Sequence, residues 1–252
     1  MPVQHDVECA ICCTPTESLG MKWQPCCGKH LCNGNGCLHS TCYVTTHADE
    51  DTPCPFCRAP LPKTDEEMFE RIRQRVKRND TTAISNLGNY YHNGTYGLER
   101  DALKAFELWS RAEYLGSTSS EMFYSLGIAY NSGEVVEKDA MKVNKYWQRA
   151  AMDGHVHARY NLGVMEMNYS PWRAYMHFTI AAKGGNDRSL KKTKQGYLEG
   201  FVTKDEFAET LRAYQKTTSA RSTKHRDIAT AHYAYERKAE EAARNGGSPY
   251  VL

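Results

Sequence analysis

Residues 25–37 read PCCGKHLCNGNGC, and they lie between two Cys-x-x-Cys pairs, CAIC at residues 9–12 and CPFC at residues 54–57. All ten cysteines of the 252-residue chain lie before residue 58. A segment of this size buries too little apolar surface to fold unaided and therefore needs cross-links. The Cys-x-x-Cys spacing lets two thiolates reach one Zn²⁺ ion, which prefers tetrahedral sulfur ligands.

Disulfides are the alternative to zinc for these cysteines. The chain opens MPVQHDVECAIC, without a basic start or an apolar run that would direct it to an oxidising compartment. We therefore expect an intracellular protein, cytoplasmic or nuclear, whose N-terminal cysteines bind zinc.

The order of the cysteines resembles that of the RING finger family, and CPFCRAP at residues 54–60 is close to that family's usual ending. In RING fingers, ligand pairs one and three hold one zinc, and pairs two and four hold the other. The resemblance therefore implies two Zn²⁺ ions in a cross-braced fold. It implies a first site of Cys9, Cys12, Cys32 and Cys37, and a second site that contains Cys54 and Cys57.

The middle ligands of the second site depart from the family pattern. RING fingers usually read Cys-x-His before the third pair, and Lys29 stands where that histidine would be. An ammonium group cannot bind zinc. Cys26 and Cys27 are the first candidates for the missing ligands, and the alternatives are His30, His39 and Cys42.

Two further features concern the cysteines of this segment. Four residues separate Cys32 from Cys37 instead of the usual two, and glycines at positions 34 and 36 allow the positive φ values of such a bend. Cys13 is most simply a spare thiol.

RING fingers bind a ubiquitin-conjugating enzyme charged with ubiquitin and hold it in a reactive pose, without a covalent intermediate. Three positions match the family's contact surface. Ile11 and Pro55 match the apolar contacts, and Arg58 matches the position whose guanidinium donates to both ubiquitin and the conjugating enzyme. The plainer interpretation is that Pro55 shapes the zinc knuckle and Arg58 is solvated.

The composition excludes several other classes of protein. The chain is 40% hydrophobic and 25% charged, with a formal net charge of +2. No apolar run is long enough to span a membrane, and the near-neutral charge favours neither nucleic acid nor an acidic lipid surface as a partner. No catalytic Ser-His-Asp set, phosphate loop or paired-carboxylate motif is present.

Residues 61–82 are expected to form a linker and a leading helix. Thr64 followed by Glu67 predicts a capping box that starts the helix. Met68, Ile72 and Val76 then follow at i, i+4 and i+8, which predicts one apolar stripe.

From residue 83 the chain repeats itself. The pattern Ala83-x₃-Leu87-Gly88-x₂-Tyr91-x₂-Gly94 recurs from Met122, and a third, shorter unit starts at Ala158. A second block in each unit carries the recurring residues Ala105, Trp109 and Ala112, then Val143, Trp147 and Ala150, then Phe178, Ala181 and Ala182. A period of roughly 36 to 39 residues predicts an all-α solenoid of helix-turn-helix repeats.

These units resemble the Sel-like repeat, a relative of the tetratricopeptide repeat. Small residues would let the paired helices approach closely, aromatic residues would fill the space between layers, and glycines would end the helices in the left-handed conformation. The domains expected are a RING-type finger at 1–60, repeats over 83–216 (about 83–118, 122–156, 158–187 and 190–216), and a tail at 217–252. Within the tail, residues 226–244 show a helical pattern, with Ile228, Tyr235, Ala239 and Ala242 on one side, which predicts a helix that caps the repeats.

Two functions fit this organisation. In the first, the chain is a RING-type ubiquitin ligase (a transferase) whose repeats bind a protein or peptide substrate or adaptor. In the second, it is a non-catalytic zinc-binding scaffold for protein–protein interaction. Ile11, Pro55 and Arg58 favour the ligase, whereas the absent histidine and the inserted residues before Cys37 favour the scaffold.

Overall fold

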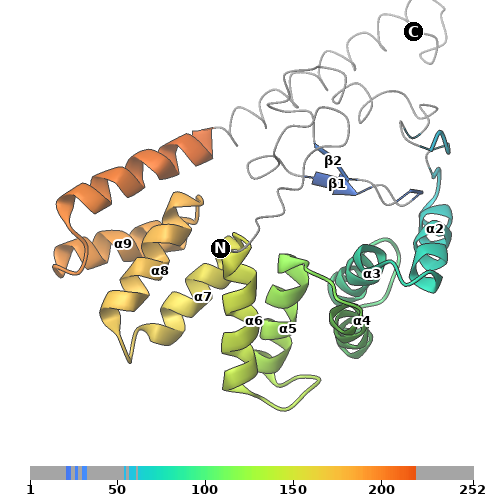
Figure 1. Cartoon of the computed structure of the whole chain (residues 1–252), viewed down its shortest axis with the longest axis horizontal. Helices are drawn as coiled ribbons and strands as arrows, with labels where there is room; N and C mark the ends of the chain where they lie inside the picture. The colour runs from blue at the N-terminus through green and yellow to red at the C-terminus, as the bar shows by residue number, and fades with distance from the viewer. Residues whose placement is uncertain are drawn as a thin grey trace, which may run out of the picture. The chain divides into compact units, whose positions relative to one another are not determined.

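The computed structural model describes residues 21–23, 26–27, 30–32, 54, 57–60 and 62–219 (Figure 1). The chain divides into two compact units, Met1–Asp153 and Gly154–Leu252. Each unit is described by itself.

A short hairpin lies in the cysteine-rich segment. Strands β1 (Met21–Trp23) and β2 (His30–Cys32) pair antiparallel, with Met21 opposite Cys32 and Trp23 opposite His30. The residues that join the two strands include Cys26 and Cys27, which lie in a turn. The hairpin therefore holds these two cysteines at its tip.

Helix α2 (Asp65–Lys77) is the predicted leading helix. The hydroxyl of Thr64 accepts a hydrogen bond from the backbone N–H of Glu67 at 3.2 Å, and the Glu67 carboxylate accepts one from the backbone N–H of Lys63. The predicted start is therefore confirmed. Ile72 is fully buried, and the partly buried Met68 and Val76 pack against the same cluster. The cluster also contains Phe69, which lies beside the predicted stripe.

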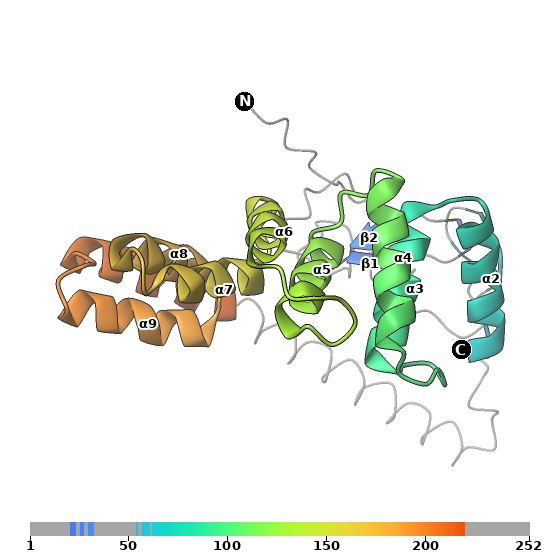
Figure 2. The ribbon, with the colours of Figure 1, turned by 90° about the horizontal axis from the view of Figure 1, so that it is seen from below.

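Four further helices of the first unit form two pairs. They are α3 (Thr81–Asn93), α4 (Ala102–Tyr114), α5 (Ser120–Ser132) and α6 (Ala140–Met152). Helix α3 packs on α4, and α5 packs on α6 (Figure 2). Short polar side chains cap their first turns: Asp80, Asp101, Ser119 and Asp139 each accept a backbone N–H.

Close contact between a glycine and an aromatic ring joins each pair. A Cβ atom built on Gly88 would lie 2.6 Å from Nε1 of Trp109, so only glycine fits there. In the second pair, Gly127 faces Trp147 in the same way. The indole N–H of Trp109 donates to the side-chain oxygen of Asn89 at 3.0 Å, so the buried ring has its polar atom satisfied.

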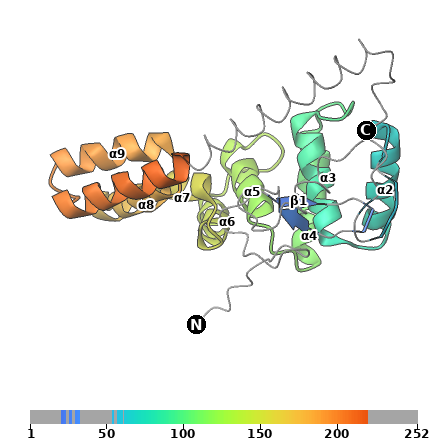
Figure 3. The ribbon, with the colours of Figure 1, turned by 90° about the horizontal axis from the view of Figure 1, so that it is seen from above.

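The second unit continues the same design in a shorter form. It contains α7 (Val156–Glu166), α8 (Pro171–Lys183), α9 (Asp187–Leu198) and helical residues 204–219, with α8 packed on both α7 and α9 (Figure 3). Phe178 takes the place of the tryptophan and lies against Gly163, where an added Cβ would lie 2.6 Å from the ring. A smaller ring thus fills the equivalent space.

The glycines that follow the helices adopt the predicted left-handed conformation. Gly94 and Gly133 are the C-caps of α3 and α5, with φ values of 63° and 73°. Among the described helices, none has the length and hydropathy that crossing a membrane requires.

Candidate metal centre

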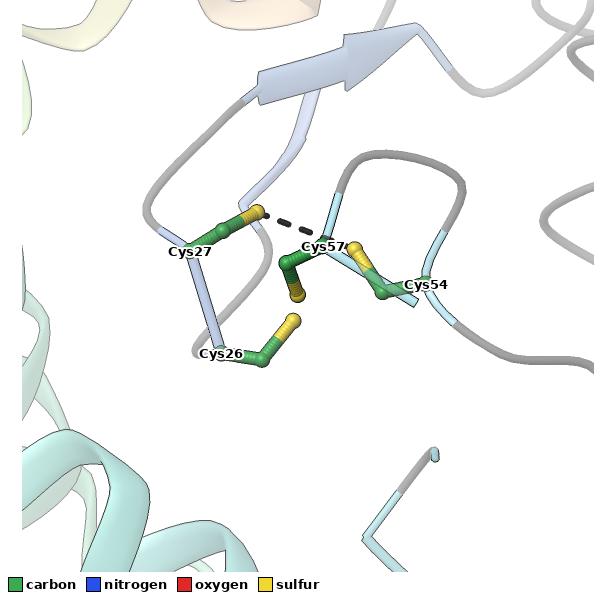
Figure 4. A group of neighbouring side chains, drawn as sticks. All are labelled: Cys26, Cys27, Cys54 and Cys57. Carbon is green, nitrogen blue, oxygen red and sulfur yellow. Dashed lines mark hydrogen bonds between the residues drawn. The ribbon is translucent and has the colours of Figure 1, made fainter. Parts of the chain in front are cut away.

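Four thiols from two separate segments meet in the N-terminal region. The Sγ atoms of Cys26, Cys27, Cys54 and Cys57 all lie within 4.8 Å of one another (Figure 4). We call this group the four-cysteine cluster. The side chain of Cys54 is buried, those of Cys26 and Cys27 are partly buried, and that of Cys57 is exposed.

Backbone hydrogen bonds shape the second of these segments. The carbonyl of Cys54 accepts a hydrogen bond from the N–H of Arg58, and the N–H of Cys54 donates to the carbonyl of Ala59, both at 2.8 Å. Arg58 adopts a left-handed backbone with φ of 55°, which is uncommon for a residue that has a Cβ. This tight turn points Cys54 and Cys57 to the same side.

The sulfur separations fit zinc coordination better than a covalent bond. The Sγ atoms of Cys27 and Cys54 are 3.7 Å apart. A disulfide requires about 2.05 Å. Four sulfur ligands at about 2.3 Å from one tetrahedral ion lie about 3.8 Å from each other. The four thiols of the cluster form no disulfide, and four sulfur donors are a set that a structural zinc site uses.

The protonation of the thiols in the four-cysteine cluster depends on whether a cation lies between them. Burial raises the pKa of the Cys26 thiol, and hydrogen bonds with Cys54 and Cys57 raise it further. Four thiolates so close together would repel one another, which favours the protonated Cys26 thiol when no cation is present. A divalent cation among the sulfurs reverses this balance and favours thiolates.

The structure describes only part of the predicted site. Cys26 and Cys27, the first candidates for the middle ligands, lie beside Cys54 and Cys57. His30 and Cys32 belong to strand β2, and Arg58 is exposed directly after Cys57. The other predicted ligands and contact residues lie outside the described residues: Cys9, Cys12, Cys37, His39, Cys42, Ile11 and Pro55. The first zinc site therefore stays a prediction.

A second candidate site lies where the first two repeats meet. An open groove of about 670 Å³ is lined by Phe106 of α4, Tyr130 of α5 and Met141 of α6, among other residues. The ammonium group of Lys142 lies 4.6 Å from the centre of the Tyr130 ring. The charged residues of the lining have both signs, with Lys138 and Lys142 beside Glu137 and Asp139, so the groove offers apolar contacts without a net charge. The sequence signal was weak because Met141, which is 83% exposed, lies outside the recurring core positions.

Comparison with known families identifies the repeats. Residues 81–117 and 124–155 match the Sel1 repeat family, so the prediction of Sel-like repeats is confirmed there. The crystal structure of a Sel1 repeat protein from Oxalobacter formigenes has a TM-score of 0.51 at 23% sequence identity, covering 64% of this chain and 66% of that chain. That likeness shows the fold alone. A protective antigen from uropathogenic Escherichia coli strains, which displays an SLR fold, gives a TM-score of 0.49 at 26% identity, covering 69% of this chain and 39% of that one.

One curated relative is similar over a shorter stretch. The ERAD-associated E3 ubiquitin-protein ligase component HRD3B of Arabidopsis thaliana is 30% identical over 102 residues. These residues make up 40% of this chain and 15% of that protein, so the chain spans only a small part of the relative's length.

Proposed function

We propose that this protein is a RING-type ubiquitin ligase whose Sel1 repeats bind the protein to be modified or an adaptor for it. The observation that carries the proposal is the four-cysteine cluster followed directly by an exposed arginine, Arg58. Cys26, Cys27, Cys54 and Cys57 would hold one Zn²⁺ ion, which supplies folding energy and no reactive group.

In this proposal, the chain accelerates ubiquitin transfer by positioning the charged conjugating enzyme. Arg58 is exposed and lies in the hydrogen-bonded turn that closes around Cys54. A guanidinium group offers five donors in a fixed fork, so it can bridge two proteins at once. Ile11 and Pro55 would supply the apolar contact with the conjugating enzyme.

The repeats supply the protein-binding part of the proposal. Sel1 repeats suggest protein–protein interaction, and the groove beside Tyr130 offers apolar groups and charged groups of both signs to a peptide. The relative from Arabidopsis thaliana is named as a component of a ubiquitin-protein ligase, which is consistent with a role of such repeats in ubiquitin transfer.

The experiment that tests the ligase is ubiquitin discharge from a panel of charged conjugating enzymes, with the full chain added. The wild type should accelerate discharge with at least one enzyme. Arg58→Ala should slow discharge about tenfold to a hundredfold, because it removes charge-assisted hydrogen bonds worth about 1.5–3 kcal/mol. Binding of the conjugating enzyme should change little in this variant, whereas Ile11→Ala should abolish it.

Arg73→Ala is the matched control, because Arg73 is an exposed arginine on α2 outside the cysteine-rich segment. It should leave discharge unchanged. All variants should keep the zinc content and helical signal of the wild type, so that a lost activity cannot reflect unfolding.

A second candidate function is a zinc-binding scaffold without ligase activity. Lys29 at the usual histidine position, together with adjacent Cys26 and Cys27 in one cluster, gives a zinc site that differs from the usual RING pattern. If the wild-type chain holds zinc, folds, and leaves discharge unchanged across the whole panel, the scaffold is the better description.

A further inference from the structure

Helix α8 exposes a row of large apolar side chains. Trp172, Met176 and Ile180 follow one another at i, i+4 and i+8, so they lie on one face of the helix. Their exposed fractions are 59%, 46% and 47%. We call these three residues the α8 stripe.

The equivalent helices of the other repeats lack such a stripe. The N-cap residues of α4, α6 and α8 are Asp101, Asp139 and Ser170, and aligning the helices on them gives the positions that correspond to the α8 stripe. They hold Leu103, Glu107 and Arg111 in α4, and Met141, Lys145 and Arg149 in α6, all exposed. Only in α8, among these three helices, are the second and third positions apolar. The repeat fold does not require apolar residues there, so the α8 stripe needs another explanation.

The described chain ends beside this helix. The hydroxyl of Thr217 donates to the backbone carbonyl of Lys183, the last residue of α8, at 3.0 Å. The ammonium group of Lys183 also lies 2.7 Å from the carboxylate of Glu209. The helical residues 204–219 therefore deliver the chain to the C-terminal end of α8.

The sequence beyond this point contains a matching partner. Residues 226–244, here the C-terminal segment, lie outside the described residues, and their sequence pattern predicts an amphipathic helix. Ala231, Tyr235 and Ala239 repeat the i, i+4, i+8 spacing of the α8 stripe. A helix over this segment would be about 28 Å long, against about 20 Å for α8. The connecting residues 220–225 can reach at most about 20 Å, which is enough to reverse direction.

We propose that the C-terminal segment folds back antiparallel onto α8 and covers the α8 stripe. In this register, Ala231 lies opposite Ile180, Tyr235 opposite Met176, and Ala239 opposite Trp172. The small alanines let the two helices approach, and the largest side chain faces one of them.

The charges of the two helices permit this docking. Helix α8 has no acidic residue, and its flanks carry Arg173 and Lys183. Antiparallel docking brings Asp227 to the end of α8 that carries Lys183, which already pairs with Glu209, and Glu240 and Glu241 to the end that carries Arg173, which already pairs with Glu166.

Hydrogen exchange of the full chain, followed by mass spectrometry, tests the docking. In the wild type, amides of residues 226–244 should exchange at least about tenfold more slowly than an unstructured peptide of the same sequence. The variant Met176→Glu, Ile180→Arg carries the residues of α4 at the same positions, so it should fold. It should remove the protection of residues 226–244 and leave that of α8 intact.

Met152→Glu is the control, because Met152 is an exposed apolar residue at the end of α6, outside the α8 stripe. It should leave the protection unchanged. A substitution in the C-terminal segment tests the same contact. Tyr235→Asp should make the fluorescence of Trp172 easier to quench with acrylamide. The signal of Trp172 is obtained by subtracting that of the same chain with Trp172→Phe.

Three results would overturn the proposal. Residues 226–244 could exchange as fast as the unstructured peptide. They could be protected equally in the wild type and in the α8 double variant, which would place them on another surface. Protection that disappears on dilution would show that a second copy of the chain covers the α8 stripe.

Discussion

In the first repeat, Trp109 packs against Gly88 with no room for one more carbon atom, whereas in the cysteine-rich segment Cys26 lies among three thiols that would repel one another once ionised. The repeats are stabilised by atoms of the chain itself, namely buried rings, small residues and capped helix ends. The four-cysteine cluster brings together groups that stabilise one another only around a cation. We therefore expect removal of metal to unfold the cysteine-rich segment alone, and changes in the volume of a buried side chain to destabilise the repeats alone.

Removal of metal gives the largest expected difference between the two regions. We expect two bound Zn²⁺ ions per chain, and structural zinc sites contribute about 10–16 kcal/mol to folding. A strong chelator should unfold residues 1–60 and leave most of the helical circular dichroism signal. Metal analysis of the purified protein, with and without chelator, checks this.

Cysteine variants test how that metal is held. Cys57→Ser should cost one zinc ion, whereas Cys13→Ser should cost none. One bound zinc or none in the wild type would contradict the cross-braced arrangement, and loss of zinc in Cys13→Ser would contradict the choice of ligands.

Truncation of a buried ring gives the next largest effect, and it should be confined to the repeats. Trp109→Ala should lower the free energy of unfolding by about 3–5 kcal/mol, because the ring is 2% exposed and its loss leaves a cavity. Urea unfolding followed by circular dichroism measures this, and zinc content should not change. Met152→Ala, at a 74% exposed side chain, is the control and should have little effect. A harmless Trp109→Ala would mean that the repeat packing is wrong.

At Gly88, which faces Trp109, the substitution Gly→Ala should change stability in the direction opposite to its usual one. In an ordinary helix, Gly→Ala stabilises by about 1 kcal/mol. Gly88→Ala should instead destabilise by about 1–3 kcal/mol, because its Cβ would overlap the Trp109 ring. In a chain that already carries Trp109→Ala, the same change should no longer destabilise. Additive effects in this double-variant comparison would argue against direct contact.

Acidification should give the smallest effect, again in the repeats. Burial, together with the nearby charge of Arg159, lowers the pKa of His177, and its Nδ1 is buried without a hydrogen-bond partner among the described residues. The unfolded chain therefore binds a proton near pH 6.5 that the folded chain binds only at lower pH. Stability should be constant above about pH 6.5 and fall below it.

Urea midpoints between about pH 7.5 and about pH 5.5 measure this slope. His177→Gln should reduce it. It should not abolish it, because burial also lowers the pKa of His92. An unchanged slope in His177→Gln would show that other groups cause the acid sensitivity.

The sequence predicted the repeats well because their recurring residues are the ones that touch. Gly88 and Trp109 stand out by repetition, and the structure places them in contact. The start of α2 was likewise readable from Thr64 and Glu67, since a capping hydrogen bond joins residues only three positions apart. Such short-range or repeated contacts leave a pattern that one sequence can reveal.

Contacts between distant, unrepeated residues were harder to predict. Spacing alone left several donors open for the middle of the second zinc site, because it does not show how the hairpin folds against residues 54–57. The structure places Cys26 and Cys27, in the turn between β1 and β2, beside Cys54 and Cys57. The exposure of the α8 stripe could not be predicted from the sequence either, because its residues fit a helical pattern whether they are buried or exposed. Only the burial of Ala174, Tyr175 and Phe178 shows that the stripe is on the other face.

The number of residues between two side chains that touch affects when their contact can form during translation. Trp109 and its hydrogen-bond partner Asn89 are 20 residues apart, so the first repeat can close soon after both have left the ribosome. Cys27 and Cys54 are separated by 27 residues, and in the proposed zinc site their association would depend on a metal ion from the surroundings. The segment that is translated first would therefore finish folding at a time set by zinc supply, while the repeats behind it fold at a pace set by elongation.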